Sequence, residues 1–385
     1  MEEDISRRTL LRSGSAGLAA VSSAGLAGCA GSLPFLGDEE DGSSGPPVGN
    51  WLAAPAVTDL LDTEALTERY TDGTVDSSEE IDRQFNAVVP DSVFEHEEEL
   101  VVYWPLERGA AHRSRAGVAA TDLDWELSQT VSWEFEVSHT RQTWDGTTTQ
   151  TDTMESSVEY AFLAGSFDPA SIKENLQDWV DDEYAEDDEL SSEGDHEGYE
   201  LYAIENWAFG VSEGSIVQAN GGSYLDAVSA VEAAIDANAS ASGLWSETDD
   251  GGAMLGEFSA KHMSSGSVHE PRTVETELER QYGDPDNIPD QQRQEIEDRI
   301  EDQFDDWERG LTGTATSYEF DGDTSEFTEV FLYDSESDAN AEALTDHVDS
   351  NRDVSDRWAT LEDSSIDGSG RTLVLSGTVR TRSLL

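Results

Sequence analysis

One short motif has the spacing of a catalytic nucleophile. Gly210-Val211-Ser212-Glu213-Gly214 matches G-x-S-x-G, in which a strand enters a helix through a sharp turn that exposes the serine hydroxyl. Here both flanks, 207–211 and 216–219, read as strands. We therefore interpret 212–215 as a hairpin turn and Ser212 as a turn residue. A surface hydrolase with Ser212 as its nucleophile stays open as the least favoured hypothesis.

Histidines and acidic loops could bind metal ions, but their spacing does not predict a site. No two histidines stand four residues apart as in H-E-x-x-H, and the neighbours His196-Glu197 and His269-Glu270 would point to opposite faces of a strand. The loop 321–326 alternates oxygen ligands like a calcium loop but lacks its glycine at position six and its glutamate at position twelve. The sequence predicts no metal, no cofactor and no catalytic constellation. The histidines are His96, His112, His139, His196, His262, His269 and His347.

Two further residues are candidates for contacts at the surface. Asn238-Ala239-Ser240 is the one N-x-S/T sequon, so Asn238 is a candidate for N-glycosylation on an exported chain. Among the 10 tryptophans, Trp144 falls in a polar stretch, where it could contact a partner or a sugar. Core packing accounts for most of the others.

The first 29 residues contain the most specific motif of the chain. Arg7 and Arg8 precede a weakly apolar Ala/Gly/Ser/Leu segment, and Leu26-Ala27-Gly28 stands directly before Cys29. Paired arginines with a modest apolar core are typical of a twin-arginine (Tat) export signal. The triplet before the cysteine matches a lipobox. We predict that 1–28 is a cleaved signal peptide and that Cys29 is lipidated.

Two other interpretations of the leader remain open. It could be a plain signal peptide cleaved elsewhere, or an uncleaved membrane anchor, although 13–28 is short and rich in Gly and Ser for a spanning helix. Cys29 is the only cysteine, which excludes an internal disulfide and cysteine-based metal centres. A lipid anchor would place the mature protein on the outer face of the cytoplasmic membrane, with membrane lipid and the Tat translocase as partners.

The composition is strongly acidic. The chain has 85 Asp and Glu against 21 Lys and Arg, a formal charge of −64. Such a charge opposes compaction in dilute buffer, but at about 1 M salt the Debye length falls to about 3 Å and the repulsion is screened. We interpret the composition as adaptation to high salt. It excludes nucleic acid as a partner and disfavours direct binding to anionic lipid.

The remaining chain divides by composition into a tether and two modules. Residues 29–50 are Gly, Ser, Pro and acids, typical of a flexible acidic tether. We expect a first module at 51–240, with a hairpin insert, and a second at 241–385. The order strand, turn, helix, strand recurs from Tyr160 and from Val330. This predicts an α+β fold of antiparallel sheets with helices packed on one face, built from a duplicated ferredoxin-like module.

Local patterns predict individual elements within these modules. Residues 59–70 and 78–89 read as short helices, 100–104 as a buried strand and 131–137 as a half-buried strand. The Thr-rich segment 139–152 reads as a hairpin connection with a turn at Asp145-Gly146. Asp168 and Pro169 have the types of a helix N-cap and first turn. Another helix is predicted over 290–308.

The leader resembles those of Tat-exported lipoproteins of halophilic archaea, and the region after the tether is similar to an uncharacterised group of them. That similarity rests on Trp51-Leu52-Ala53-Ala54-Pro55, on 163–168 before a helix, and on the closing strand 373–378. It implies a fold and a location but no activity. Our first hypothesis is a non-enzymatic binding or interaction module of the cell envelope, whose envelope-protein or small-molecule partner the sequence does not name. The alternative is a solute-binding lipoprotein of an ABC importer.

Overall fold

The computed structural model describes residues 46–384, except 71, 98–99, 101–105, 108, 145, 186–188, 223, 283–284, 286–287 and 353–355. Arg7, Arg8 and Cys29, with the predicted signal peptide and most of the tether, lie outside the described residues. So does most of the strand predicted at 100–104. No helix among the described residues is long and apolar enough to span a membrane.

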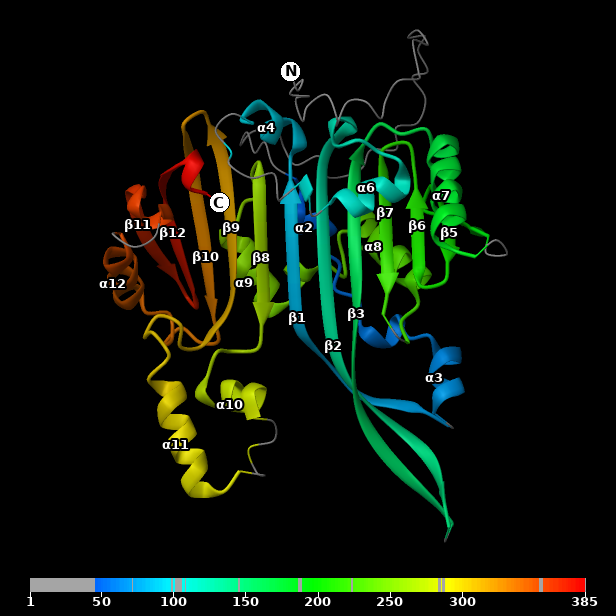
Figure 1. Cartoon of the computed structure of the whole chain (residues 1–385), viewed down its shortest axis with the longest axis horizontal. Coiled ribbons are helices and arrows are strands. Elements are labelled where there is room, and N and C mark those ends of the chain that lie inside the picture. Colours follow the sequence, from blue (N-terminus) through cyan, green and yellow to red (C-terminus); the bar gives the residue numbers. More distant parts are fainter. Residues whose placement is uncertain are drawn as a thin grey trace, which may run out of the picture.

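All twelve named strands belong to one sheet in the order β11-β12-β10-β9-β8-β1-β2-β3-β7-β6-β5-β4, and every neighbouring pair is antiparallel (Figure 1). The predicted α+β class with antiparallel pairing is therefore confirmed, but the strands form one sheet and not several. The strands are β1 (Thr74–Val88), β2 (Leu123–Thr143), β3 (Gly146–Gly165), β4 (Ser191–His196), β5 (Tyr199–Ile204), β6 (Trp207–Val211), β7 (Ser215–Gly221), β8 (Met263–His269), β9 (Leu311–Asp321), β10 (Thr324–Tyr333), β11 (Glu362–Ser369) and β12 (Thr372–Arg380).

The helices precede β1 or lie in the connections between strands, some of which join neighbouring strands of the sheet, such as β1 to β2 and β8 to β9, and some of which do not, such as β7 to β8. They are α2 (Val48–Trp51), α3 (Thr63–Arg69), α4 (Pro90–Glu95), α6 (Ala110–Ala116), α7 (Pro169–Glu183), α8 (Ala227–Ser240), α9 (Asp249–Glu257), α10 (Val274–Tyr282), α11 (Asp290–Glu301), α12 (Ala341–Asn351) and α13 (Asp356–Ala359). Short 3-10 turns include η1 (Val57–Asp59), η2 (Ala120–Asp122), η3 (Trp245–Glu247) and η5 (Thr381–Ser383).

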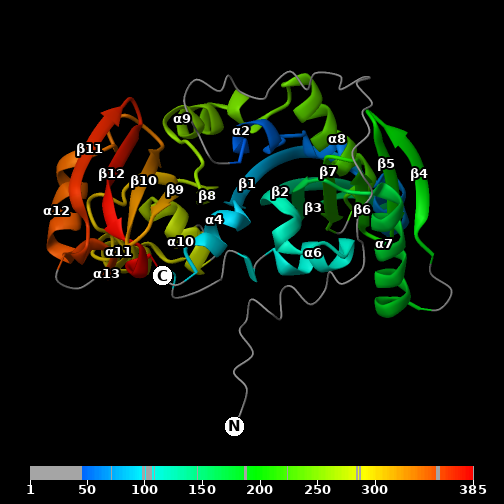
Figure 2. The ribbon, with the colours of Figure 1, turned by 90° about the horizontal axis from the view of Figure 1, so that it is seen from above.

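Helices cover both faces of the sheet, so the prediction of helices on one face was wrong. Figure 2 shows α8 and α9 on one side and α6 and α7 on the other. The reason is visible in β6, whose five residues are all buried, so that alternate side chains enter different cores. Phe209 packs with α7 residues such as Leu176, whereas Ala208 joins the core that contains Val231 of α8. A strand whose side chains are buried on both faces of the sheet needs other elements packed against each face.

The segment 78–89, predicted as a helix, lies almost entirely in β1. Phe85 and Ala87 alternate into the core, and β1 is hydrogen-bonded on both sides, to β2 and to β8. Two flanking strands outweigh the weak helical preference of its acidic residues. The helix predicted over 59–70 is present in part, as α3, and the one over 290–308 ends early, at Glu301.

Other local predictions are confirmed. The strand at 131–137 lies within β2, and 212–215 joins β6 to β7 in a hairpin. Asp168 caps α7, since its carboxylate accepts a hydrogen bond from the Ala170 backbone N–H at 3.4 Å. The turn near Asp145-Gly146 closes a hairpin, but β2 and β3 continue through the polar segment and pair up to Thr143↔Gly146.

Candidate binding cavity

An open cavity of about 770 Å³ occupies a notch in the sheet. β8 pairs with β1 as far as Asp82↔His269 and then ends, whereas β1 continues beside β2 to Thr74. The chain after β8, η3 with the start of α9, and the ends of β10 and β12 close the notch. The lining residues are Glu79, Glu80, Ile81, Asp82, Trp245, Thr248, Asp249, Asp250, Val268, His269, Glu270, Pro271, Thr312, Asp334 and Arg371.

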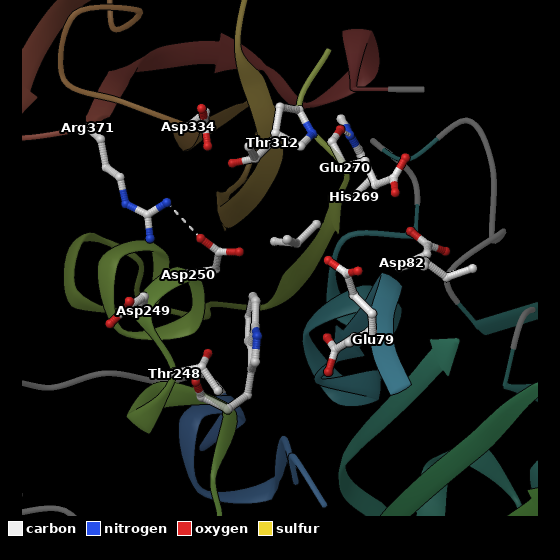
Figure 3. Close-up of a pocket in the computed structure, with 15 residues that line it drawn as sticks. Glu79, Asp82, Thr248, Asp249, Asp250, His269, Glu270, Thr312, Asp334 and Arg371 are labelled. Atoms are coloured by element: carbon white, nitrogen blue, oxygen red, sulfur yellow. Dashed lines mark hydrogen bonds and ion pairs between the residues drawn. The ribbon is translucent and has the colours of Figure 1, made fainter. Parts of the chain in front are cut away.

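Carboxylates dominate the polar lining. Figure 3 shows Glu79 and Asp82 on one side of the cavity, and Asp249, Asp250 and Arg371 on the other. The Arg371 guanidinium lies 2.7 Å from the Asp250 carboxylate, and it also donates to the Tyr333 carbonyl at 3.3 Å. Seven carboxylates thus share the lining with one arginine, which leaves the cavity strongly negative.

The carboxylate row continues from the cavity across the sheet. Glu79 of β1 stands directly opposite Glu134 of β2, which stands directly opposite Glu155 of β3. Like charges in such positions repel each other. Partial burial, followed by repulsion from Glu155, Glu270 and Glu79, raises the pKa of Glu134. A cation bound near this row would relieve that repulsion.

Local sequence fixes the two aspartates at the start of α9. The Thr248 side chain caps the helix by accepting the Gly251 backbone N–H at 3.1 Å, which leaves Asp249 and Asp250 in the first turn. A Cβ on Gly251 would lie 2.0 Å from the Trp245 carbonyl oxygen. Glycine therefore allows α9 to pack directly on η3, and this contact holds both aspartates at the cavity.

The apolar wall of the cavity is anchored by a buried arginine. Arg83 of β1 is 1 % exposed, and its guanidinium lies over the Trp245 ring at 5.2 Å from the centroid. It donates to both oxygens of Glu80 at 2.8 Å and to the Ala53 carbonyl at 2.7 Å. Each charge of this pair is thus compensated, and Glu80 is held in one orientation.

The cavity suits binding better than proton-transfer chemistry. Its one histidine, His269, has Nδ1 2.7 Å from the Glu270 carbonyl oxygen, which this nitrogen binds as a donor. Carboxylates attract an organic cation through charge, and the apolar part of the lining can contact its carbon chain. Among the described residues, no group of three His, Cys, Asp or Glu is placed to hold a metal ion.

The sequence candidates lie elsewhere in the fold. Ser212 is in the β6–β7 turn, where its hydroxyl is 3.0 Å from both the carbonyl oxygen and the backbone nitrogen of Ser215. None of the hydrogen bonds among the described residues joins Ser212 to a histidine. Asn238 is in the last turn of α8, half-buried. The 321–326 loop is the β9–β10 turn.

Four of the remaining histidines pair with different carboxylates, and the other two contact the same ring, that of Phe320. His112 pairs with Glu159, His139 with Asp152, and His347 with Asp305. His196 lies between two carboxylates of α8, Glu232 and Asp236. His262 Nδ1 accepts the Phe320 backbone N–H, and His96 contacts the Phe320 ring edge-on.

The sequence did not reveal the cavity, because 78–89 was read as a helix although it forms the strand whose residues 79–82 line the cavity. A usable signal was present after η3: Thr248-Asp249-Asp250 has the types of an N-cap and an acidic first turn. What the sequence could not supply is the proximity of β1, α9 and Arg371.

Comparisons with known proteins identify no family. No family model matches the chain, and no curated protein matches it significantly. Among solved structures, crystal form III of TP0453 is 9% identical, and the match covers 78% of this chain and 91% of that chain with a TM-score of 0.35. Crystal form I of TP0453 is 10% identical, with coverages of 78% and 90% and the same TM-score of 0.35. At this similarity neither a shared fold nor a function follows.

Proposed function

We propose that this chain is a lipid-anchored, non-enzymatic binding protein of the cell surface, which takes an organic cation into the cavity between β1, α9 and Arg371. The observation that carries the ligand class is the carboxylate row of Glu79, Glu134 and Glu155, which leads from a cavity walled by Trp245. Export through Arg7 and Arg8, and anchoring through Cys29, rest on the leader sequence.

An organic cation fits the cavity better than a bare metal ion does. A volume of about 770 Å³ exceeds what an ion needs, and the wall includes Ile81, Val268 and Pro271 besides the tryptophan. Apolar contact also matters because molar salt screens the attraction of exposed carboxylates. The solute-binding alternative calls for two parallel-sheet lobes around a cleft, and the single antiparallel sheet gives it no support.

Calorimetric titration in molar KCl tests the proposed ligand class. The probe is spermidine, with a neutral polyol of similar length as its control. We expect saturable binding of spermidine alone, weakened at least tenfold by Glu79→Gln and unchanged by Glu362→Gln on the terminal strand β11. Absence of spermidine binding, or equal binding by Glu79→Gln, would overturn the proposal.

We further infer that the two halves of the sheet are copies of one module, as a duplicated ferredoxin-like type implies. Counted outward from the central β1–β8 pair, β1, β2, β3, β7 and β6 have the same order as β8, β9, β10, β12 and β11. A helix follows the third strand in each half: α7 after β3 and α12 after β10. An experimental structure in which these two sets of elements do not superpose would contradict the duplication.

A further inference from the structure

The hairpin of β2 and β3 extends past its neighbours as a two-stranded arm, visible in Figure 1 as the ribbon that projects beyond the rest of the sheet. Pairing of β1 with β2 begins at Thr74↔Ser138, and β7 reaches β3 only at Val158↔Gly221. We call residues 139–151 the arm. Among the described residues, no third strand pairs with either of its edges. Free strand edges are templates for pairing with another chain.

The arm lacks the charges that protect the other edges of the sheet. Residues 139–151 read His-Thr-Arg-Gln-Thr-Trp-Asp-Gly-Thr-Thr-Thr-Gln-Thr, with one carboxylate, in a chain where 85 of 385 residues are acidic. The terminal strands β4 and β11 carry carboxylates at Glu193, Asp195, Glu362, Asp363 and Asp367. Charged edges prevent pairing, so the neutral, Thr-rich arm is more open to pairing than either of the terminal strands β4 and β11.

Trp144 stands at the tip of this arm and is 97 % exposed. Only one other large hydrophobic residue among those described, Tyr282, is exposed, at 45 %. An indole ring on a polar hairpin tip packs against nothing in its own chain, and exposed aromatic residues mark interaction sites.

A pocket of about 560 Å³ lies farther along the same strand, where the pairing with β7 ends. It is lined by residues 151–155 of β3 together with Arg69, Tyr70 and Tyr224. The Arg69 guanidinium lies 5.6 Å from the Tyr70 ring centroid and 5.7 Å from that of Tyr224, and no carboxylate among the described residues forms an ion pair with it. Tyr224 has a φ of 71°, a strained conformation for a bulky residue.

We propose that the arm pairs with the arm of a second copy of this chain, and that each Trp144 enters the other copy's pocket. In this dimer the two β3 edges pair antiparallel, with Thr149 of one copy opposite Thr149 of the other. This register sets Gly146 of each copy opposite residue 152 of the other. The tip of each arm then lies beside the segment 151–155 that lines the pocket. The indole ring meets the Arg69 guanidinium, a cation–π contact, and two tyrosine rings.

Three observations favour a second copy over an unrelated partner. Trp144 lies in the turn directly before β3 and the pocket lies along β3, so a twofold axis at Thr149 brings each Trp144 beside the other copy's pocket, as an isologous interface requires. A chain with a net charge of −64 repels its copies least where carboxylates are scarce, and the arm has one carboxylate in 13 residues; Asp152 and Glu155 of the pocket lie beside the Arg69 side chain that lines it too. The arm also projects from the body, so that two bodies need not touch (Figure 1).

Cysteine cross-linking tests the register. Because Cys29 is the only native thiol, Thr149→Cys in a Cys29→Ser chain provides one reactive position. Under oxidation in molar KCl we expect a disulfide-linked dimer. Ser192→Cys on the terminal strand β4 is the matched control, also exposed on an edge strand, and should remain monomeric. Equal cross-linking by both variants would contradict the proposed register.

Sedimentation velocity over a concentration series tests the contacts. The wild-type chain should show a monomer–dimer equilibrium, with a dissociation constant raised at least tenfold by Trp144→Ala and by Thr149→Glu, and unchanged by Ser192→Glu. Thermal midpoints equal to wild type would show that the exposed substitutions leave the fold intact. A wild-type chain that stays monomeric at every concentration, or a dimer that both substitutions leave unchanged, would overturn the proposal.

Discussion

The guanidinium of Arg83 lies over the ring of Trp245, 5.2 Å from its centroid, and this contact joins the central strand β1 to the wall of the cavity. Arg83 is buried, and its N–H groups donate hydrogen bonds to the Glu80 carboxylate and to the Ala53 carbonyl. The same side chain therefore supports the core, orients a cavity carboxylate and holds the aromatic wall. Shape and charge of the cavity depend on one buried cation.

Replacement of Arg83 by methionine should be strongly destabilising. Arg83→Met removes the partner of Glu80 and leaves the Ala53 carbonyl with only the Gln129 side-chain amide, 3.1 Å away. Breaking a fully buried ion pair from one side costs about 3–5 kcal/mol, and we expect a smaller loss here because the Glu80 side chain is 31 % exposed and gains water when Arg83 is removed. Urea unfolding in molar KCl measures this loss, and Arg83→Lys should lose less because the charge remains. An unchanged midpoint for Arg83→Met would show that the pair contributes nothing.

Two glycines of α9 should respond oppositely to alanine. In Gly251→Ala the new Cβ would lie 2.0 Å from the Trp245 carbonyl oxygen, so η3 and α9 must separate. We expect a loss of about 1–3 kcal/mol, as for other overpacked sites. Gly256 has nothing within 4 Å of its Cβ position, so Gly256→Ala should gain up to about 1 kcal/mol from helix propensity. Denaturant unfolding of both variants checks the contrast; similar changes would contradict the close packing.

His262 should make the protein less stable as the pH falls below neutrality. Burial lowers the pKa of His262 from its ordinary 6.5, so the unfolded chain takes up this proton before the folded one does. The contribution of the neutral ring is complete above pH 6.5 and is lost as the pH falls through the folded pKa. Thermal midpoints between pH 7.5 and 5 should fall less for His262→Gln than for wild type, and parallel profiles would exclude this role.

The lipid anchor predicts a change of compartment for one substitution. In the proposed function Cys29 is the acceptor of the lipid, so the Cys29→Ser chain should be released into the medium or accumulate as a precursor with 1–28 attached. Membrane fractionation at molar salt, combined with mass spectrometry of the N-terminus, measures both outcomes. Unchanged membrane association, with an unmodified Cys29 in the wild type, would contradict the anchor.

Sequence patterns were reliable where one local interaction decides the structure. The cap of α7 follows from Asp168 and Pro169, because a carboxylate at the N-cap binds the first free N–H groups whatever lies beyond. The β6–β7 turn follows from the alternation on both its sides. β1 was misread, since its acids carry no periodic apolar face, and only the pairing with β2 and β8 makes it a strand.

The sequence by itself determined the acidic composition, the α+β class and the antiparallel pairing, because charge and hairpin turns are properties of neighbouring residues. The tertiary structure alone decided that the strands form one sheet with helices on both faces. It also brought Glu79, Asp250 and Arg371 to one cavity, and left Trp144 exposed on the arm with a pocket along the same edge. These relations join residues far apart in the chain, and strand register and helix packing fix them rather than any local preference.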